Sequence, residues 1–240
     1  MARDMQQAPI PMIMTRPEAG GQAFVRNMPA DLRQRLKIIE SPLLSIEAVV
    51  RDPGSDDAGA AIFTSANGVR FAPEARGRKA WCVGRSTTQA ARDAGWDAVT
   101  AGPDSAGLIE TLRRERPEVS LVHFSGVHTR GKVVEKLAED GLSVRRVTVY
   151  DQPLLALSEA ARAVLAGDDP VIVPLFSPRT AAWFVEQCPE PGNVIAVFLS
   201  AAVARATGQA RFAQQVISAW PDARSVVNCI ENLTVSARPG

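Results

Sequence analysis

The chain has 240 residues, of which 46% are hydrophobic and 22% charged, and its net charge is +1. This is the composition of an ordinary globular protein, and it excludes a disordered or fibrous chain. The balanced charge also argues against a general nucleic-acid-binding surface, which needs clustered lysine and arginine, and no apolar run approaches the ~20 residues of a membrane-spanning helix.

The first residues, MARDMQQAPIPMIMTRP, lack the long apolar core and small-residue cleavage site of a signal peptide. The three cysteines, Cys82, Cys188 and Cys229, are too far apart for a zinc site or a small disulfide framework. Buried, reduced thiols are the expected interpretation, which favours a cytoplasmic protein.

Along the chain, a short apolar run followed by a hydroxyl residue and a helix-like segment recurs. The instances are PMIMTRPEAGGQAF from residue 11, AIFTSANGVRF from 61, LVHFSGVHTRG from 121 and VPLFSPRTAAWF from 173. The apolar runs are typical of strands buried on both faces, and the segments behind them of helices. For example, VVEKLAEDG (133–141) closes on Gly141, a good C-terminal cap.

A second pattern of strand, short turn and helix follows two of these instances. It is WCVGRSTTQAARDAGW (81–96) after the second and VFLSAAVARATG (197–208) after the fourth. The repeated pattern therefore predicts two related α/β units, each with a parallel sheet and right-handed crossovers.

Two extended, proline-flanked segments interrupt the alternation, ESPLLSIEAVV (40–50) and VRRVTVYDQPLL (144–155). If they pair, the first domain is discontinuous, and the second is inserted into it. The expected boundaries are 1–40 with 153–240 for the first domain, 45–149 for the second, and about 41–48 and 146–152 for the linkers. Two antiparallel linkers would form a hinge, with a cleft between the domains.

Candidate binding residues follow the strands of the expected sheets. In open parallel sheets, ligands bind beyond the carboxyl ends of the strands, where free helix N–H groups favour anions. The residues expected there are Thr15, Thr64, Ser65, Thr87, Ser125 and Ser177, and Asn67 beside Ser65 is a further candidate. Each one alone is more simply an N-cap, because Ser, Thr and Asn are preferred caps everywhere. Several such residues in two facing domains favour a cleft for a polyanion.

Three arginines, Arg16, Arg130 and Arg179, also follow strand ends. Surface charge is the ordinary interpretation of an arginine, and recognition of a carboxylate or phosphate is the functional one. Arg130, in HTRGK, is placed ahead because it lies beside a glycine at an expected turn.

Other chemistries find less support. A nucleophilic Ser65 lacks the G-x-S-x-G motif and a neighbouring histidine. VGRST (83–87) has one glycine where a dinucleotide fingerprint needs three. The two histidines, His123 and His128, flank a strand end, and neither has partner ligands at a metal-binding spacing; one is expected to be a polar core residue.

Tyr150 is the sole tyrosine and lies on the second extended segment. A β-rich linker accepts tyrosine for packing alone. A residue on a hinge also faces a cleft as easily as solvent, and there its phenol could donate a proton to a leaving group.

Taken in order, several motifs resemble those of the uroporphyrinogen-III synthases. They are TRP (15–17), FTSANGVRF (63–71), VGRSTTQAARDAGW (83–96), TRGKVVEKLAEDGLSVRRVTVY (129–150) and LFSPRTAAWF (175–184), and they span nearly the whole chain. The resemblance implies two flavodoxin-like α/β domains joined by a two-stranded antiparallel linker, the first domain being discontinuous.

The resemblance also implies a monomeric, cofactor-free lyase without a metal. It would convert hydroxymethylbilane to uroporphyrinogen III by loss of the hydroxyl, cyclisation and inversion of the D ring through a spiro intermediate. Tyr150 matches the family tyrosine that assists hydroxyl departure, and Thr87 and Ser65 match cleft residues. Ser200 and Val203 stand where the family often has glycine and threonine, so no ligand contact is carried over to that loop.

Two rivals to the synthase share the expected architecture. One is a non-catalytic two-domain binder that closes on a small anion, and the other is a nucleotide-dependent doubly wound enzyme. The architecture alone does not separate these functions. The lone glycine of VGRST disfavours the nucleotide-dependent enzyme.

Overall fold

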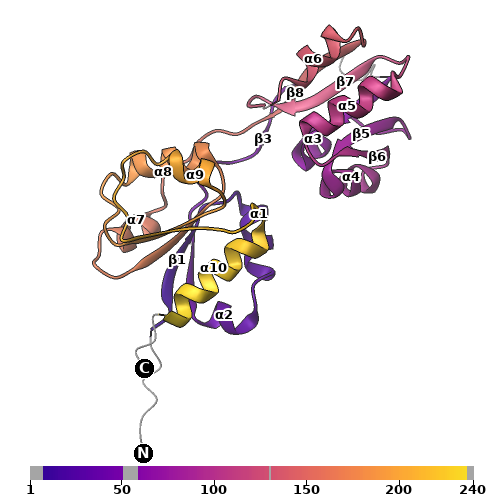
Figure 1. Ribbon diagram of the computed structural model, residues 1–240. Helices are drawn as coiled ribbons and strands as arrows, with labels where there is room; N and C mark the ends of the chain where they lie inside the picture. Colours follow the sequence, from indigo (N-terminus) through magenta and orange to yellow (C-terminus); the bar gives the residue numbers. More distant parts are fainter. Residues whose placement is uncertain (1–7, 51–58, 130, 237–240) are drawn as a thin grey trace, which may run out of the picture. The chain divides into compact units, whose positions relative to one another are not determined.

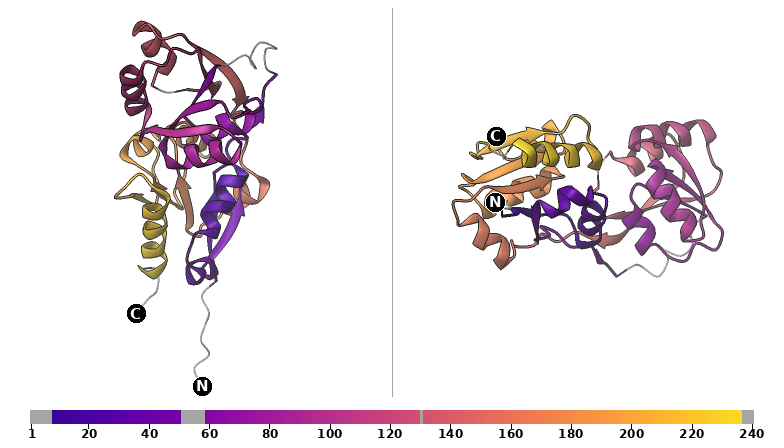
Figure 2. Two further views of the ribbon diagram at one scale, coloured as in Figure 1. Left: turned by 90° about the vertical axis from the view of Figure 1, so that its right-hand side faces the viewer. Right: turned by 90° about the horizontal axis from the view of Figure 1, so that it is seen from below.

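The computed structural model describes residues 8–50, 59–129 and 131–236 (Figure 1). The chain divides into two compact units. Unit 1 comprises Met1–Ser45 and Leu154–Gly240, and unit 2 comprises Ile46–Pro153. Each unit has a β-sheet of mainly parallel strands with helices on both faces (Figure 2), so the predicted α/β fold with parallel sheets is confirmed.

The described strands of unit 1 form a parallel sheet in the order β11-β10-β9-β1-β2. They are β1 (Ile10–Met14), β2 (Leu36–Glu40), β9 (Val171–Leu175), β10 (Val194–Phe198) and β11 (Gln214–Ile217). Alternate residues of a strand point to opposite faces. Met12 and Met14 therefore pack with one set of helices, and Ile13 packs with the other.

The helices that pack on Met12 and Met14 are α1 (Glu18–Arg26), α2 (Ala30–Gln34) and α10 (Ala223–Ser236). The helices that pack on the opposite face, around Ile13, are α7 (Glu159–Leu165), α8 (Pro178–Gln187) and α9 (Ala201–Arg205). Since both faces are covered, the central strands β1, β9 and β10 are apolar along their length, as the sequence predicted.

Unit 2 has a sheet in the order β3-β8-β7-β4-β5-β6, parallel except for the β3–β8 pair. Its strands are β3 (Glu47–Ala48), β4 (Ala60–Phe63), β5 (Lys79–Val83), β6 (Asp97–Gly102), β7 (Leu121–Gly126) and β8 (Val144–Asp151). One face is covered by α3 (Ala66–Phe71) and α4 (Gly84–Asp93), and the other by α5 (Ser105–Glu115) and α6 (Val133–Glu139).

The predicted strand, hydroxyl and helix pattern is present at each of its four places. The junctions are β1–α1, β4–α3, β7–α6 and β9–α8. In FTSANGVRF the glycine has a specific purpose. A Cβ on Gly68 would lie 2.6 Å from the carbonyl oxygen of Phe124, so only glycine lets α3 pack this closely on β7.

The two extended segments run antiparallel where they meet. Glu47 pairs with Asp151, Ala48 with Tyr150, and Leu44 forms a bridge with Leu154. Residues 144–150 also pair in parallel with β7, so most of the expected second linker is a full strand of the unit 2 sheet. The buried apolar residues Val147 and Val149 explain this, because they complete the core beneath α3 and α4.

Candidate active site

Two predicted site hydroxyls are used inside the fold. The Thr15 hydroxyl donates to the carbonyl oxygen of Pro174 at 2.8 Å, which ties the end of β1 to β9. The Ser125 hydroxyl accepts from Nε of Arg146 at 2.9 Å, which ties the end of β7 to β8. Both side chains are only 2% exposed. In the structure, the hydroxyls of Thr15 and Ser125 fix the ends of strands. A contact of either hydroxyl with a substrate remains a prediction.

Two further predicted residues are helix caps. The Ser177 oxygen accepts from the Thr180 amide at 3.1 Å and hydrogen-bonds the Thr180 hydroxyl at 2.8 Å. The Ser65 oxygen accepts from the Asn67 amide at 3.2 Å. Among the described residues, however, nothing accepts the Ser65 hydroxyl proton or bonds the Asn67 carboxamide. Ser65 and Asn67 therefore retain donors for a ligand, whereas the Ser177 hydroxyl is already engaged by Thr180.

Arg16 presents a cation at the end of β1. Its guanidinium lies 4.8 Å from the ring centroid of Phe176, which itself packs edge-on against Phe24 at 5.1 Å. Partial burial lowers the pKa of Arg16. No described residue forms an ion pair or hydrogen bond with this guanidinium. A partly desolvated cation held on an aromatic ring suits a carboxylate ligand.

Arg130, the other predicted cationic contact, lies outside the described residues.

Thr87 lies in the first turn of α4, and the first two residues of this helix, Gly84 and Arg85, line a pocket. The helix starts directly at Gly84, and its N-cap, Val83, has no side chain that can satisfy the free N–H groups. Thr88 donates back to the Gly84 carbonyl at 2.9 Å. The Thr87 hydroxyl, in contrast, makes no hydrogen bond to any described residue. It remains available to a ligand.

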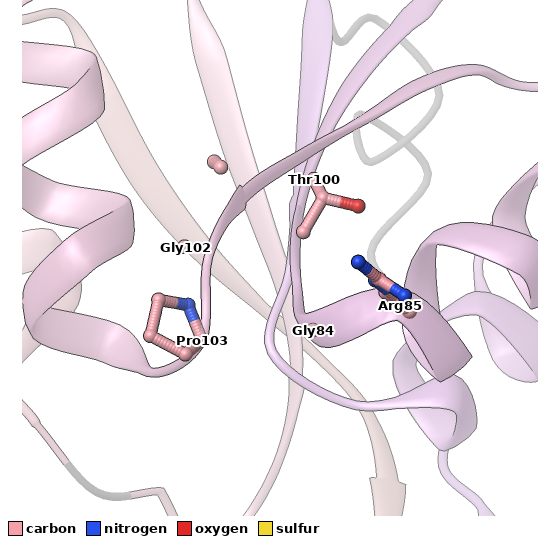
Figure 3. A pocket seen from close by; sticks show the side chains of 6 residues that line it. Gly84, Arg85, Thr100, Gly102 and Pro103 are labelled. Carbon is pink, nitrogen blue, oxygen red and sulfur yellow. The ribbon is translucent and has the colours of Figure 1, made fainter.

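The pocket at this edge of unit 2 has a volume of about 440 Å³ (Figure 3). Its lining residues come from the start of α4 and the end of β6, and they are Gly84, Arg85, Thr100, Ala101, Gly102 and Pro103. Arg85, which lines the pocket, is not among the binding residues expected from the sequence, where only the glycine and the threonine of VGRST were candidates. The available signal was an arginine one residue after a strand-end glycine.

The phenol of Tyr150 is held near the end of β8. The residue is 6% exposed, and its ring stacks on Phe71 with centroids 6.1 Å apart. The ring also lies against Gly126, where an added Cβ would come within 2.6 Å of Cζ. None of the described residues hydrogen-bonds the Tyr150 hydroxyl. The result is a fixed phenol with a proton to give.

A family model of uroporphyrinogen-III synthase HemD matches residues 32–228. The chain belongs to the uroporphyrinogen-III synthase family. This is a family of cyclising lyases. A search of curated proteins finds no match.

Solved structures with this fold include other uroporphyrinogen-III synthases. The Helicobacter pylori 26695 enzyme has a TM-score of 0.67 and 14% identity over 94% of this chain and 99% of its own. A mutant enzyme from Thermus thermophilus has a TM-score of 0.52 and 14% identity over 95% of this chain and 100% of its own. At these identities the likeness shows a shared fold.

The loop at Ser200 and Val203 is the one to which the resemblance carried over no ligand contact. Ser200 precedes α9 and makes no side-chain cap to it. Val203 is 2% exposed and belongs to the core between α9 and the sheet. Val203 therefore makes an apolar core contact and offers no hydroxyl to a ligand, which supports leaving this residue out of the proposed site.

His123 is a buried polar residue, as predicted for one of the two histidines. Its Nε2 lies 3.1 Å from the Thr64 hydroxyl. Burial and, to a smaller extent, the positive charge of Arg146 lower the pKa of His123 to about 4, and Glu135 opposes the shift. The ring is therefore neutral at pH 7. Within residues 8–50, 59–129 and 131–236, no three His, Cys, Asp or Glu side chains gather as metal ligands.

Proposed function

We propose that this protein converts hydroxymethylbilane into uroporphyrinogen III, with loss of water and inversion of the D ring, in tetrapyrrole (haem, chlorophyll and cobalamin) biosynthesis. The observation that carries the proposal is the state of Tyr150. The sole tyrosine, which the resemblance equates with the family tyrosine, is fixed by Phe71 and Gly126 and has no hydrogen-bond partner among the described residues.

The substrate binds through its carboxylates, of which hydroxymethylbilane has eight. Arg16 is the proposed cationic contact for these carboxylates, and Ser65, Asn67, Thr87 and Arg85 are the proposed donors. Such dispersed contacts are consistent with a net charge of only +1. They hold a flexible linear chain in the curved shape that ring closure requires, and this ordering supplies most of the rate enhancement.

Tyr150 acts as the general acid. The bond from carbon to the terminal hydroxyl breaks with its electron pair on oxygen, the phenol donates its proton, and water departs. The phenolate that remains lies beside the positive charge left on the tetrapyrrole. Ring closure then releases a pyrrole proton, which restores the phenol, so the reaction balances as substrate to product plus water.

We further propose that the enzyme works as a monomer in the cytoplasm. All three cysteines are free thiols, which suits a reducing compartment. Both units bury their own apolar cores within a single chain. No helix in the described part of the chain is long and apolar enough to cross a membrane.

The test is an isomer assay. Hydroxymethylbilane is generated enzymatically in the presence and absence of the purified protein, and the products are oxidised and separated by chromatography. We expect the type III isomer with the protein and the spontaneous type I isomer without it. Type I in both reactions would show that the protein has no synthase activity, and unchanged but bound tetrapyrrole would identify a binder instead.

A further inference from the structure

The strand pairing at Tyr150 is irregular. β7 and β8 pair in register up to Ser125 and Thr148, but the next pair is Gly126 with Tyr150, so Val149 is an extra residue on β8. Such a bulge re-aims the residue that follows it. Val149 and Tyr150 accordingly belong to the same core cluster, beneath α3 and α4, although consecutive strand residues normally point to opposite faces.

Gly126 provides the space into which the bulge directs the phenol. Val122 and Phe124 of β7 point into the same core, so alternation puts position 126 on that face as well. A Cβ there would lie 2.5 Å from Cε2, 2.6 Å from Cζ and 3.0 Å from the hydroxyl oxygen of Tyr150. These distances are too short for unbonded atoms, so any side chain at 126 displaces the ring.

Arg146 holds the backbone on which the ring rests. Its Nε donates to the Ser125 hydroxyl at 2.9 Å, and its Nη2 donates to the carbonyl oxygens of Gly126 and of Val127, the latter at 2.7 Å. The Val127 amide donates in turn to the Tyr150 carbonyl at 3.0 Å. One guanidinium thus binds two consecutive backbone carbonyl oxygens at the end of β7, opposite the bulge.

We propose that Gly126 and Arg146 are positioning residues, which set the phenol of Tyr150 for proton donation. Gly126 leaves the space for the ring, and Arg146 fixes the end of β7 opposite the bulge. Neither residue transfers a proton. This inference rests on the proposed acid role of Tyr150, and the experiments below separate the failure of one from the failure of the other.

The first experiment observes the ring without substrate. Because the chain has one tyrosine, incorporation of 3-fluorotyrosine gives a fluorine NMR signal for Tyr150 alone. We expect Gly126→Ala and Arg146→Gln each to shift or split this signal. The matched controls are Gly192→Ala, where an added Cβ meets no atom within 4 Å, and Arg114→Gln at an exposed position of α5. Both should leave the signal unchanged. An unchanged signal in both test variants overturns the proposal.

The second experiment is kinetic. A displacement of about 1 Å in a reacting group costs on the order of 100-fold, so we expect Gly126→Ala to lower kcat about 10- to 100-fold while KM changes less than about threefold. In a Tyr150→Phe background, Gly126→Ala should lower kcat no further, because there is no hydroxyl left to misplace. A full additional loss in that background would show a general structural effect and overturn the proposal.

The two hypotheses fail differently. If Tyr150→Phe retains the wild-type rate, the acid role is wrong. If Tyr150→Phe is slow but Gly126→Ala is as fast as Gly192→Ala, the acid role stands and the positioning role is wrong. Should Gly126→Ala fail to fold, Arg146→Gln carries the same two tests, since it adds no atoms to the α3 face of the sheet.

Discussion

Units 1 and 2 share a plan of parallel strands, strand-end hydroxyls and capped helices, yet they offer different chemistry at their strand ends. In both, a serine caps the helix that follows a buried strand, Ser177 in unit 1 and Ser65 in unit 2. Unit 1 adds a cation, Arg16 on Phe176, whereas unit 2 adds the phenol of Tyr150. The repeated part of the sequence is thus structural. Under the proposed function, the part that differs would add a cationic contact in unit 1 and the general acid in unit 2.

The comparison is tested most strongly by Tyr150→Phe. Phenylalanine keeps the ring on Phe71 and over Gly126 but removes the proton. General acid catalysis contributes ~10²–10⁴-fold, so we expect kcat to fall by that factor with KM nearly unchanged, measured as the initial rate of type III formation. Circular dichroism checks that the fold persists. A loss of only a few fold would assign Tyr150 to positioning.

The pH dependence of stability should also differ between the units. In unit 2, the pKa of folded His123 is about 4, below the 6.5 of an unfolded histidine, so the unfolded chain takes up a proton first as pH falls. Unit 2 should be fully stable above pH 6.5 and lose up to roughly 3 kcal/mol between pH 6.5 and 4. In unit 1, burial and Glu18 raise the pKa of Glu40, which favours the folded state at low pH and not at high pH.

Urea unfolding followed at pH 7.5 and pH 5 measures this difference. His123→Gln should flatten the dependence, whereas His128→Gln, at an exposed position, should not. If both variants show the wild-type slope, another group is responsible for the loss.

Arg16→Gln tests the binding role of unit 1. A hydrogen bond to a charged group contributes about 1.5–3 kcal/mol, so we expect KM to rise about 10- to 100-fold with kcat largely retained. Arg26→Gln, at the C-terminal end of α1, the helix that follows Arg16, is the matched control and should leave KM unchanged. A loss confined to kcat would move Arg16 from binding to chemistry.

The smallest effects are expected from the two caps. Ser65→Ala and Ser177→Ala should each cost about 1 kcal/mol of unfolding free energy, since each removes an N-cap acceptor. Ser65→Ala should in addition raise KM severalfold, because its hydroxyl proton has no acceptor among the described residues. Wild-type kinetics in Ser65→Ala, alongside the stability loss, would mean that Ser65 is a cap alone.

Local pattern predicted the fold class, the strand–helix junctions and the capping serines. These depend on alternation, burial and the residues next to a helix, all of which are visible in a short stretch of sequence. The glycine of FTSANGVRF could be seen there too, but not its reason, because Phe124, the residue it packs against, is distant in the chain.

Local pattern could not predict which polar side chains are hydrogen-bonded inside the fold and which remain free to bind a ligand. Thr15 bonds Pro174 across 159 positions, and Ser125 bonds Arg146 across 21, so which hydroxyls stay free depends on long-range contacts. The bulge at Val149 was likewise hidden, since nothing in VRRVTVYD distinguishes a regular strand from a bulged one. The sequence indicated Tyr150 as a candidate general acid. It did not indicate Gly126, against which the Tyr150 ring lies.

The most direct measurement is the isomer composition formed from hydroxymethylbilane at a catalytic concentration of the protein. We predict that wild-type protein gives almost entirely the type III isomer over many turnovers and that Tyr150→Phe shifts the products toward type I, because spontaneous closure overtakes the slowed enzyme. Type I as the sole product with wild-type protein would contradict the assignment of synthase activity to this chain.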